Sequence, residues 1–342
     1  MKKPLIGLAP MAGITDAPMR RLCVEQGAVY TCTEMVSAIG LICAKPGNET
    51  YRLLLETTPV EKYVGCQLFG KDPLVMGEAA ARLTELKRFQ SIDINMGCPA
   101  RKVVSSGEGS ALLKNPDLAF KIMTEIRRNT DLPVTVKTRL GYDRESMNAL
   151  QIGEAAKEAG LLWICIHGRT REQQYSGIAD WDAIGEIKAR LNFPVMANGD
   201  VFTAENARDI LARTGADGAF VGRGAMGNPW LFRQIRQMLS GEAVTPPTIR
   251  ERIETAIQQT EWMIQYKGEH MGVLEMRKHI GHYVAGIRGA TAIRRKVNLM
   301  SHADEVLALL HSLLEHADEE EIPLSEGPMD GTSQRDEGKD EV

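Results

Sequence analysis

SIDINMGCP, residues 91 to 99, is the stretch from which the organisation of this chain can be worked out. Its first five residues alternate small or polar side chains with isoleucine, as in a strand whose two faces meet different surroundings. Gly97 and Pro99 then interrupt both strand and helix, so a turn must come next. The stretch therefore places the thiol of Cys98 where a strand opens into a loop. Composition alone leaves a second interpretation open, a buried and inert cysteine in a tight turn.

Short runs with the composition of β-strands recur along the chain, and the run at Ser91 is the fourth of eight. Amphipathic helical stretches lie between most of them, for example at 73–87, 116–128, 147–159 and 204–213. Eight strand and helix units in alternation predict an α/β fold, the (β/α)8 TIM barrel. The predicted strands are Leu5–Ala9, Val29–Glu34, Tyr63–Leu68, Ser91–Asn95, Val134–Thr138, Trp163–His167, Val195–Asn198 and Gly218–Gly222.

Polar and glycine-rich motifs come after seven of these eight strands. In a (β/α)8 barrel the loops after the strands share one face, and the chemistry collects there. We therefore expect seven motifs to converge on one site. They are APMAGITD, GCQLFG, NMGCP, VKTRLG, IHGRT, ANGD and VGRGAMGNP.

The length of 342 residues suits one large barrel with a small appendage. No apolar run approaches the length of a membrane span, and the first ten residues contain too short an apolar segment for a signal peptide, so we expect a cytoplasmic protein. The six cysteines form no CxxC pair and no Cys/His zinc spacing. We therefore expect reduced thiols and no metal site.

The formal net charge of −4 hides a division within the chain. Residues 318 to 342 hold ten acidic residues against Arg335 and Lys339, a charge of −8, which leaves +4 for residues 1 to 317. The segment 317–342 is rich in Gly, Pro, Ser and charge and has almost nothing to bury, so it is predicted to be a disordered acidic tail.

The loops after the seventh and eighth predicted strands suit a phosphorylated cofactor. Phosphate groups in TIM barrels commonly bind at these loops, beside the N-terminus of a short extra helix. Asn198–Asp200 and Gly222–Gly224 supply glycine backbone, Arg223 adds a fixed charge, and Asn228 is expected to cap a helix that begins at Pro229. The alternative is that these glycines serve only the turns.

Two basic residues at neighbouring strand ends support a cofactor site. Lys137 lies among strand residues, where an unpaired ammonium is costly, so we expect it to face an anion or an electron-rich ring. His167 ends an apolar run and could also be a satisfied structural histidine. Because Gln67 and Lys137 occupy equivalent strand ends, a cofactor role for His167 gains weight.

The composition changes after Gly241, where a proline-marked linker leads into helical patterns at 249–265, 274–285, 290–299 and 304–315. The segment from Arg277 to His302 contains six Lys and Arg residues and no Asp or Glu. A solvated helix face is the ordinary explanation of a charge run, but such faces usually mix signs. Uncompensated positive charge favours a nucleic-acid footprint.

The stretch DINMGCPARKVVSSGEGSALL, which begins at Asp93, resembles the signature of the tRNA-dihydrouridine synthases, flavoenzymes that reduce uridine in the D-loop of tRNA. The motifs APMAGITD, GCQLFG, VKTRLG, IHGRT, NGD and GRGAMGNPW match in the same order, and RKH at Arg277 resembles the helical part of the bacterial B-type. The resemblance covers about residues 1 to 315. The acidic tail has no counterpart in it.

The resemblance implies a role for each matching residue. Cys98 would donate a proton to uracil while FMN delivers hydride, with NADPH or NADH as reductant. A cysteine thiol ordinarily has a pKa of about 8.5, so it is mostly protonated at neutral pH. FMN would be held by Pro10, Met11, Ala12, Gln67, Lys137, His167, Asn198, Gly199, Asp200, Gly222 and Arg223. Asn95 would orient the uracil, and Arg101 and Lys102 would meet flanking phosphates. The predicted substrate contacts also include Arg139 and, from the basic segment described above, Arg277, Lys278, Arg294, Arg295 and Lys296.

The patterns and the resemblance together predict three parts: an FMN-binding barrel at 1–242, a helical tRNA-binding domain at 243–316, and the tail at 317–342. A uracil inside folded tRNA must leave its stack to reach a barrel, which requires a grip on RNA beyond the base. The expected partner is tRNA, and nothing in the sequence indicates DNA, a membrane or an obligate protein partner.

Two rival functions remain. An FMN-dependent dihydroorotate or dihydropyrimidine dehydrogenase would share the barrel, but a free-base enzyme has no use for a basic helical appendage. A non-catalytic tRNA-binding or chaperone-like protein would leave Cys98 and the flavin loops degenerate, whereas they are intact.

Overall fold

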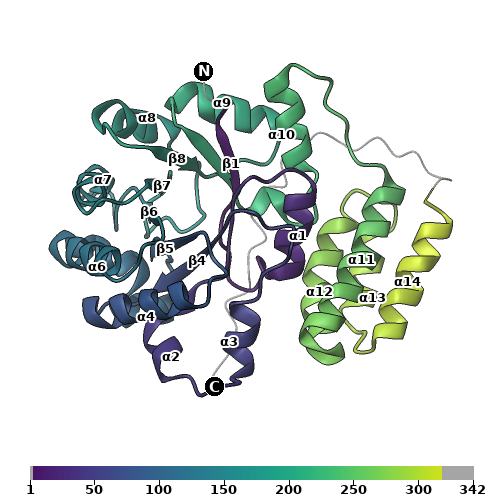
Figure 1. Ribbon diagram of the computed structural model, residues 1–342. Coiled ribbons are helices and arrows are strands. Elements are labelled where there is room, and N and C mark those ends of the chain that lie inside the picture. Colours follow the sequence, from purple (N-terminus) through teal and green to yellow (C-terminus); the bar gives the residue numbers. More distant parts are fainter. Residues whose placement is uncertain (1–2, 318–342) are drawn as a thin grey trace.

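A ring of parallel strands organises the computed structural model, which describes residues 3 to 317. Neighbouring strands pair in the order β1-β9-β8-β7-β6-β5-β4-β2, and a parallel bridge between Gly7 and Tyr30 brings β1 back to β2. The prediction of a TIM barrel is confirmed (Figure 1). The ring strands are β1 Leu5–Leu8, β2 Thr31–Cys32, β4 Val64–Phe69, β5 Ser91–Met96, β6 Val134–Arg139, β7 Trp163–His167, β8 Val195–Asn198 and β9 Gly218–Val221, and β3 Val36–Ser37 adds to β4.

Helices cover the outside of the ring, and their ends reflect local sequence signals. The α4 helix starts with Pro73 behind the side-chain cap of Asp72, and α6 starts with Pro116 behind Asn115. Gly215, in the left-handed region, ends α9. The outer helices are α1 Ala17–Glu25, α2 Ala38–Cys43, α3 Glu49–Leu54, α4 Pro73–Glu85, α6 Pro116–Arg128, α7 Ala149–Glu158, α8 Trp181–Arg190, α9 Ala204–Thr214 and α10 Leu231–Ser240. The short helix α5 Arg101–Ser105 lies in the loop region at the carboxyl end of β5.

Aromatic side chains fill the interior of the barrel. Tyr30 packs edge-on to Trp163, with ring centroids 5.2 Å apart, and lies 5.6 Å from Phe220. Cys32, Cys165 and Met196 complete this buried cluster. Because the interior is packed and not a pore, a ligand can enter only where the loops after the strands leave space.

Four further helices form a second lobe beside the barrel, on the right of Figure 1. We call α11 Ile249–Lys267, α12 Glu269–Tyr283, α13 Ala290–Val297 and α14 Ala303–Glu315 the helical lobe. It has its own buried cluster, which includes Ile253, Met276 and Tyr283 and also takes in Trp230 from the barrel side. The four predicted helices are present, although their bounds differ.

Three local predictions are wrong. The α12 helix begins at Glu269, not Leu274, because Gly272 packs tightly on the backbone of α11 and remains helical. The α10 helix begins at Leu231, not at Pro229, and the Asn228 side chain does not cap it. The chain instead turns at Gly227, which has a φ of +61°, before the helix begins. The second strand shrinks to Thr31–Cys32.

Among residues 3 to 317, no helix combines the length and apolar composition that a membrane span requires. The predicted acidic tail lies outside the described residues, apart from Ala317.

Candidate active site

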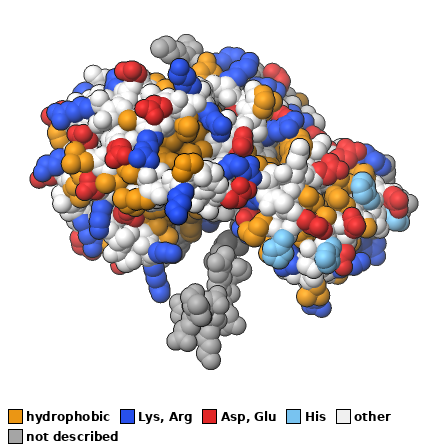
Figure 2. Space-filling view, turned by 60° about the horizontal axis from the view of Figure 1, so that its bottom comes forward, with side chains coloured by type: hydrophobic (Ala, Val, Ile, Leu, Met, Phe, Trp, Pro, Cys, Tyr) orange, Lys and Arg blue, Asp and Glu red, His pale blue; other side chains and the backbone are white. Residues whose placement is uncertain are grey.

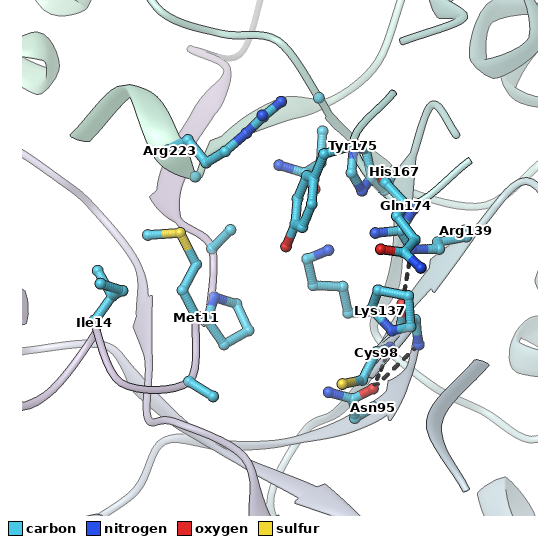
Figure 3. Close-up of a pocket in the computed structure, with 18 of the residues that line it drawn as sticks. Met11, Ile14, Asn95, Cys98, Lys137, Arg139, His167, Gln174, Tyr175 and Arg223 are labelled. Atoms are coloured by element: carbon cyan, nitrogen blue, oxygen red, sulfur yellow. Dashed lines mark hydrogen bonds between the residues drawn. The ribbon is translucent and has the colours of Figure 1, made fainter. Parts of the chain in front are cut away.

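A cavity of about 700 Å³ opens at the carboxyl ends of the strands. In Figure 3, Cys98 and Asn95 lie at one side of it, Arg223 lies at the opposite side, and Lys137 and Tyr175 point into the space between. Fifteen of the predicted site residues line this cavity: Pro10, Met11, Ala12, Gln67, Asn95, Cys98, Arg101, Lys137, Arg139, His167, Asn198, Gly199, Asp200, Gly222 and Arg223. Lys102, Arg277, Lys278, Arg294, Arg295 and Lys296 are not among the lining residues.

A chain of hydrogen bonds fixes the turn that carries Cys98. The side-chain oxygen of Asn95 accepts the backbone N–H of Cys98 at 2.9 Å, and its amide nitrogen donates to Gln67 at 2.8 Å. Gln67 in turn donates to Asp93 at 2.7 Å, and Thr135 donates to the other carboxylate oxygen at 2.5 Å. Burial raises the pKa of Asp93, whereas these two hydrogen bonds lower it. The turn is therefore anchored to the barrel floor.

Cys98 differs from the other cysteines in its surroundings. All six thiols are free, but only Cys98 lines the cavity, where it is partly exposed. Cys66 and Cys165 are buried, and burial raises the pKa of each to about 12. Cys43 is exposed on α2, outside the cavity. The sequence also allowed Cys98 to be a buried and inert cysteine. Cys66 and Cys165 have such surroundings, whereas Cys98 is partly exposed in the cavity.

The lining of the cavity is electropositive. It contains Arg101, Lys137, Arg139 and Arg223, against the single carboxylate of Asp200. Burial is the largest influence on Lys137 and lowers its pKa. Within residues 3 to 317 the Lys137 ammonium has no ion pair or hydrogen bond, as expected for a lysine that faces a ligand.

The surroundings of His167 disfavour its charged form. It ends β7 and is 7% exposed. Burial holds its pKa well below the usual value, and the neighbouring cations Arg139 and Lys137 lower it further. A neutral imidazole at the cavity wall can donate or accept one hydrogen bond without adding charge.

Asp200 organises the loop after β8. With φ of +55°, it comes directly after Gly199 at +123°, where a Cβ would lie 2.8 Å from the Ala179 Cβ. Its carboxylate accepts Arg169 at 2.8 and 2.7 Å, Arg223 at 3.1 Å and the Ala179 N–H at 2.7 Å. The carboxylate thus aims Arg223 along the cavity edge, and the negative charge is already compensated.

Arg139 has a structural role in addition to the substrate contact that was predicted for it. Its side chain donates to the backbone carbonyls of Gly97 at 2.8 Å, Thr170 at 2.9 Å and Gln174 at 2.8 Å. It therefore ties the Cys98 turn to the loop after β7. A direct contact between Arg139 and substrate stays a prediction.

The remaining predicted substrate residues lie around the cavity and on the helical lobe. Lys102 is exposed on α5, next to Arg101. Arg294, Arg295 and Lys296 are exposed in the last turn of α13. Arg277 donates to the carbonyl of Met300 at 3.1 Å, which gives it a structural contact within the lobe.

Comparison with known proteins decides the family. A model of the dihydrouridine synthase (Dus) family matches residues 7 to 320. The chain belongs to the dihydrouridine synthase family. The family predicted from the motifs is thereby confirmed, and with it the class of flavin-dependent oxidoreductases.

The curated relatives of this dihydrouridine synthase match over most of their length. A probable tRNA-dihydrouridine synthase of Rickettsia conorii is 41% identical over 86% of this chain and 88% of its own. The tRNA-dihydrouridine synthase B of Pseudomonas aeruginosa is 39% identical over 87% of this chain and 89% of its own. That of Pasteurella multocida is 37% identical over 90% of this chain and 92% of its own. The resemblance to the B-type is supported by these names.

Some residues of the dihydrouridine synthase cavity escape prediction from the sequence. Tyr175 is 52% exposed, yet its ring lies 4.7 Å from the Arg223 guanidinium. Arg169 holds Asp200 from beneath the loop. Arg169 stands within the IHGRT motif and could have been singled out as a buried arginine, whereas Tyr175 lies in the unpatterned stretch QQYSG.

Proposed function

We propose that this protein is a tRNA-dihydrouridine synthase, which reduces the C5–C6 double bond of uridine in the D-loop of tRNA with FMN as cofactor and NADPH or NADH as reductant. The observation that carries the proposal is one partly exposed cysteine, Cys98, in an electropositive cavity at the carboxyl face of a barrel. The motif matches and the named relatives support the same activity.

The lining residues fit FMN. A cavity of about 700 Å³ lies in the range that cofactors and drug-sized ligands occupy. A Cβ on Gly222 would meet only the Met11 sulfur, at 3.7 Å, so this glycine leaves open space beside the loop after β9. Arg223 would bind the phosphate, and Lys137 and His167 would meet the ring. When bound, FMN supplies the hydride.

The protein itself supplies position and a proton. Cys98 would donate the thiol proton to C5 of the uracil as hydride reaches C6, and the resulting thiolate would recover a proton from water. Asn95 holds the Cys98 turn through the two backbone N–H groups of Gly97 and Cys98, at 3.2 and 2.9 Å. The Lys137 ammonium offers positive charge from desolvated surroundings, where its interaction with an anion is screened less than in bulk water.

The partner RNA would contact both parts of the molecule. We propose residues 1–242 as the catalytic barrel and 243–316 as the tRNA-binding domain, with Arg294, Arg295 and Lys296 on phosphates. Arg101 and Lys102 lie beside the cavity mouth, where they would meet the nucleotides that flank the extruded base. Figure 2 shows basic and acidic side chains interspersed over both the barrel and the helical lobe, with histidine side chains on the lobe. A tRNA-modifying enzyme of this kind would work in the cytoplasm.

One reconstitution experiment tests the proposed function. Purified protein with FMN and NADPH should convert D-loop uridine to dihydrouridine in a tRNA transcript that lacks modifications, as read by mass spectrometry of nuclease fragments. A transcript with cytidine at every D-loop uridine is the control. Efficient turnover of free uracil or orotate would instead support the free-pyrimidine rival, and a protein that never takes up FMN would support the non-catalytic one.

Replacing Arg223 by alanine should release flavin. A hydrogen bond to a charged group contributes about 1.5 to 3 kcal/mol, so flavin affinity should fall about 10- to 100-fold, and excess FMN should restore part of the turnover. Titration of the apoprotein by flavin fluorescence measures the affinity. Arg208→Ala is the matched control, because Arg208 pairs with Asp209 on the outside of the barrel. Equal affinities for the two variants would place the phosphate elsewhere.

A further inference from the structure

Helix α12 of the helical lobe contacts the loop after β1, which lines the cavity. The Lys278 ammonium donates to the carbonyl oxygen of Gly13 at 3.1 Å. The uncompensated positive charge of the segment from Arg277 to His302 predicts an RNA contact for Lys278, but this bond directs its charged end to the cofactor side of the molecule. Gly13 is two residues from Met11, which lines the cavity.

The same loop is held at two further points. The Gly13 N–H donates to the side chain of Glu34, so both backbone groups of this residue have partners from outside the loop. The Lys267 ammonium, at the end of α11, contacts the Asp16 carboxylate at 2.7 Å. Asp16 caps α1 through the Met19 N–H at 3.1 Å. The helical lobe therefore holds the loop at its middle and at its end.

Hydrogen bonds inside the loop link Gly13 to the residues that line the cavity, so a displacement of Gly13 also moves those residues. The Met11 carbonyl accepts the N–H groups of Ile14 and Thr15 at 3.1 and 3.0 Å, and the Met11 N–H donates to the Thr15 hydroxyl at 2.9 Å. These bonds form a closed turn around Gly13, which has a φ of +71°. Met11 and Ala12 are part of this turn, so they move with it.

The α12 helix also contacts the second cofactor loop, after β9. Gly227 has a φ of +61°, and a Cβ there would lie 2.8 Å from the carbonyl carbon of His282 and from the Tyr283 nitrogen. Three residues later, Trp230 packs edge-on to Tyr283, with centroids 6.1 Å apart. The loop with Gly222 and Arg223 thus ends against the same helix.

We propose that α12 is a positioning element of the cofactor site, and that Lys278 is a positioning residue that sets the loop with Met11 and Ala12 for flavin. The proposal rests on the proposed function in so far as flavin mononucleotide is the ligand of the cavity. It assigns the helical lobe a second task besides RNA binding, which is to hold both glycine loops from outside the barrel.

The first test uses Lys278→Met, which keeps the apolar stem and removes the ammonium. Flavin affinity of the apoprotein should fall about 3- to 10-fold in the absence of tRNA, less than for Arg223→Ala, because Lys278 acts on flavin only through the loop. Lys278→Arg should recover most of it. Lys188→Met is the control for the loss of an ammonium, because Lys188 contacts the Phe193 carbonyl at 3.3 Å and the Asp217 carboxylate at 2.6 Å near the amino end of β8, away from the cavity.

The dependence of tRNA affinity on salt separates the two roles of Lys278. A phosphate contact would flatten the slope of log affinity against log salt by about 0.7 to 0.9 in the methionine variant. The positioning role predicts an unchanged slope and weaker flavin binding. An unchanged flavin affinity of Lys278→Met would overturn the proposal whatever happens to tRNA, and wild-type protein that binds no flavin would remove the proposed function along with it.

The second test uses a pair of glycines with the same backbone angle. Gly227 and Gly215 both have a φ of +61°, but a Cβ on Gly215 would meet nothing within 4 Å. Alanine at either position brings the same left-handed strain. Only Gly227→Ala forces α12 away from the loop. Its flavin affinity should therefore be at least about 5-fold lower than that of Gly215→Ala, which corresponds to roughly one lost hydrogen bond. Equal losses would contradict the role of α12.

Discussion

Cys98→Ala is expected to lose about 100- to 10,000-fold in the rate of uridine reduction, the usual contribution of a general acid, while flavin still binds and is still reduced by NADPH. The reason is that the Cys98 side chain lines the cavity, whereas the hydrogen bonds that hold the surrounding loop are made by the Cys98 backbone. The backbone of the turn carries the structural bonds: the Cys98 N–H donates to the Asn95 side-chain oxygen at 2.9 Å, and the Ser110 hydroxyl donates to the Cys98 carbonyl at 2.8 Å. Alanine keeps all of these bonds.

Two half-reactions measured separately make this prediction sharp. Flavin reduction by NADPH is monitored by absorbance without tRNA, and single-turnover oxidation by tRNA is monitored in a second mixing step. Cys43→Ala is the matched control, because Cys43 is exposed but lies outside the cavity. Full activity of Cys98→Ala across the pH range would remove Cys98 from the mechanism. A defect of equal size in the NADPH step would mean that the thiol shapes the flavin site instead.

The barrel could be predicted from the sequence because its strands differ sharply in composition from the loops at their carboxyl ends. The run Trp163–His167 has the same bounds in the structure, and Val195–Asn198 does too. Each is a short apolar run closed by a polar residue and a glycine, so burial and turn chemistry agree. The sequence predicts a second strand that is too long. The strand-like pattern extends from Val29 to Glu34, whereas only Thr31 and Cys32 pair with β4.

The sequence predicts the cavity-lining residues that lie at strand ends, but not those that come from other parts of the chain. Fifteen predicted residues converge because the topology of a parallel barrel brings strand ends together. What each side chain does there depends on its partners. Arg139 donates hydrogen bonds to three backbone carbonyls, and Asp200 forms ion pairs with two arginines. The spacing of residues in the sequence predicts neither arrangement. Lys278 reaches Gly13 because the helical lobe packs against the barrel, where α11 contacts α1.

The Cys98 turn illustrates how side-chain hydrogen bonds can hold a reactive residue in a defined position. Asn95 has the hydrogen-bonding capacity to serve two sides at once, accepting from the turn and donating to Gln67. The chain of bonds ends on Asp93, which is buried among partners and cannot rotate freely. Preorganisation of this kind keeps the thiol in place before substrate arrives, which lowers the cost of orientation during the reaction.

The basic end of α13 gives the second large prediction. If Arg294, Arg295 and Lys296 contact phosphates, replacing all three by alanine should flatten the slope of log tRNA affinity against log salt by roughly two units, at about 0.7 to 0.9 for each contact. Binding should weaken almost equally for tRNAs with and without the target uridine, because phosphate contacts position the RNA and do not read its bases. Flavin affinity should stay the same, because these side chains do not line the cavity.

A control of equal charge separates contact from net charge. Lys121, Arg128 and Lys157 are exposed on α6 and α7, at the outside of the barrel, so their triple alanine variant also loses three positive charges. If tRNA responded only to the overall charge, both triple variants would show the same slope. A wild-type slope for the α13 variant would reduce this stretch to a solvated helix face. Recognition of tRNA would then have to rest on Arg101 and Lys102 at the cavity mouth, and these would be the next pair to replace.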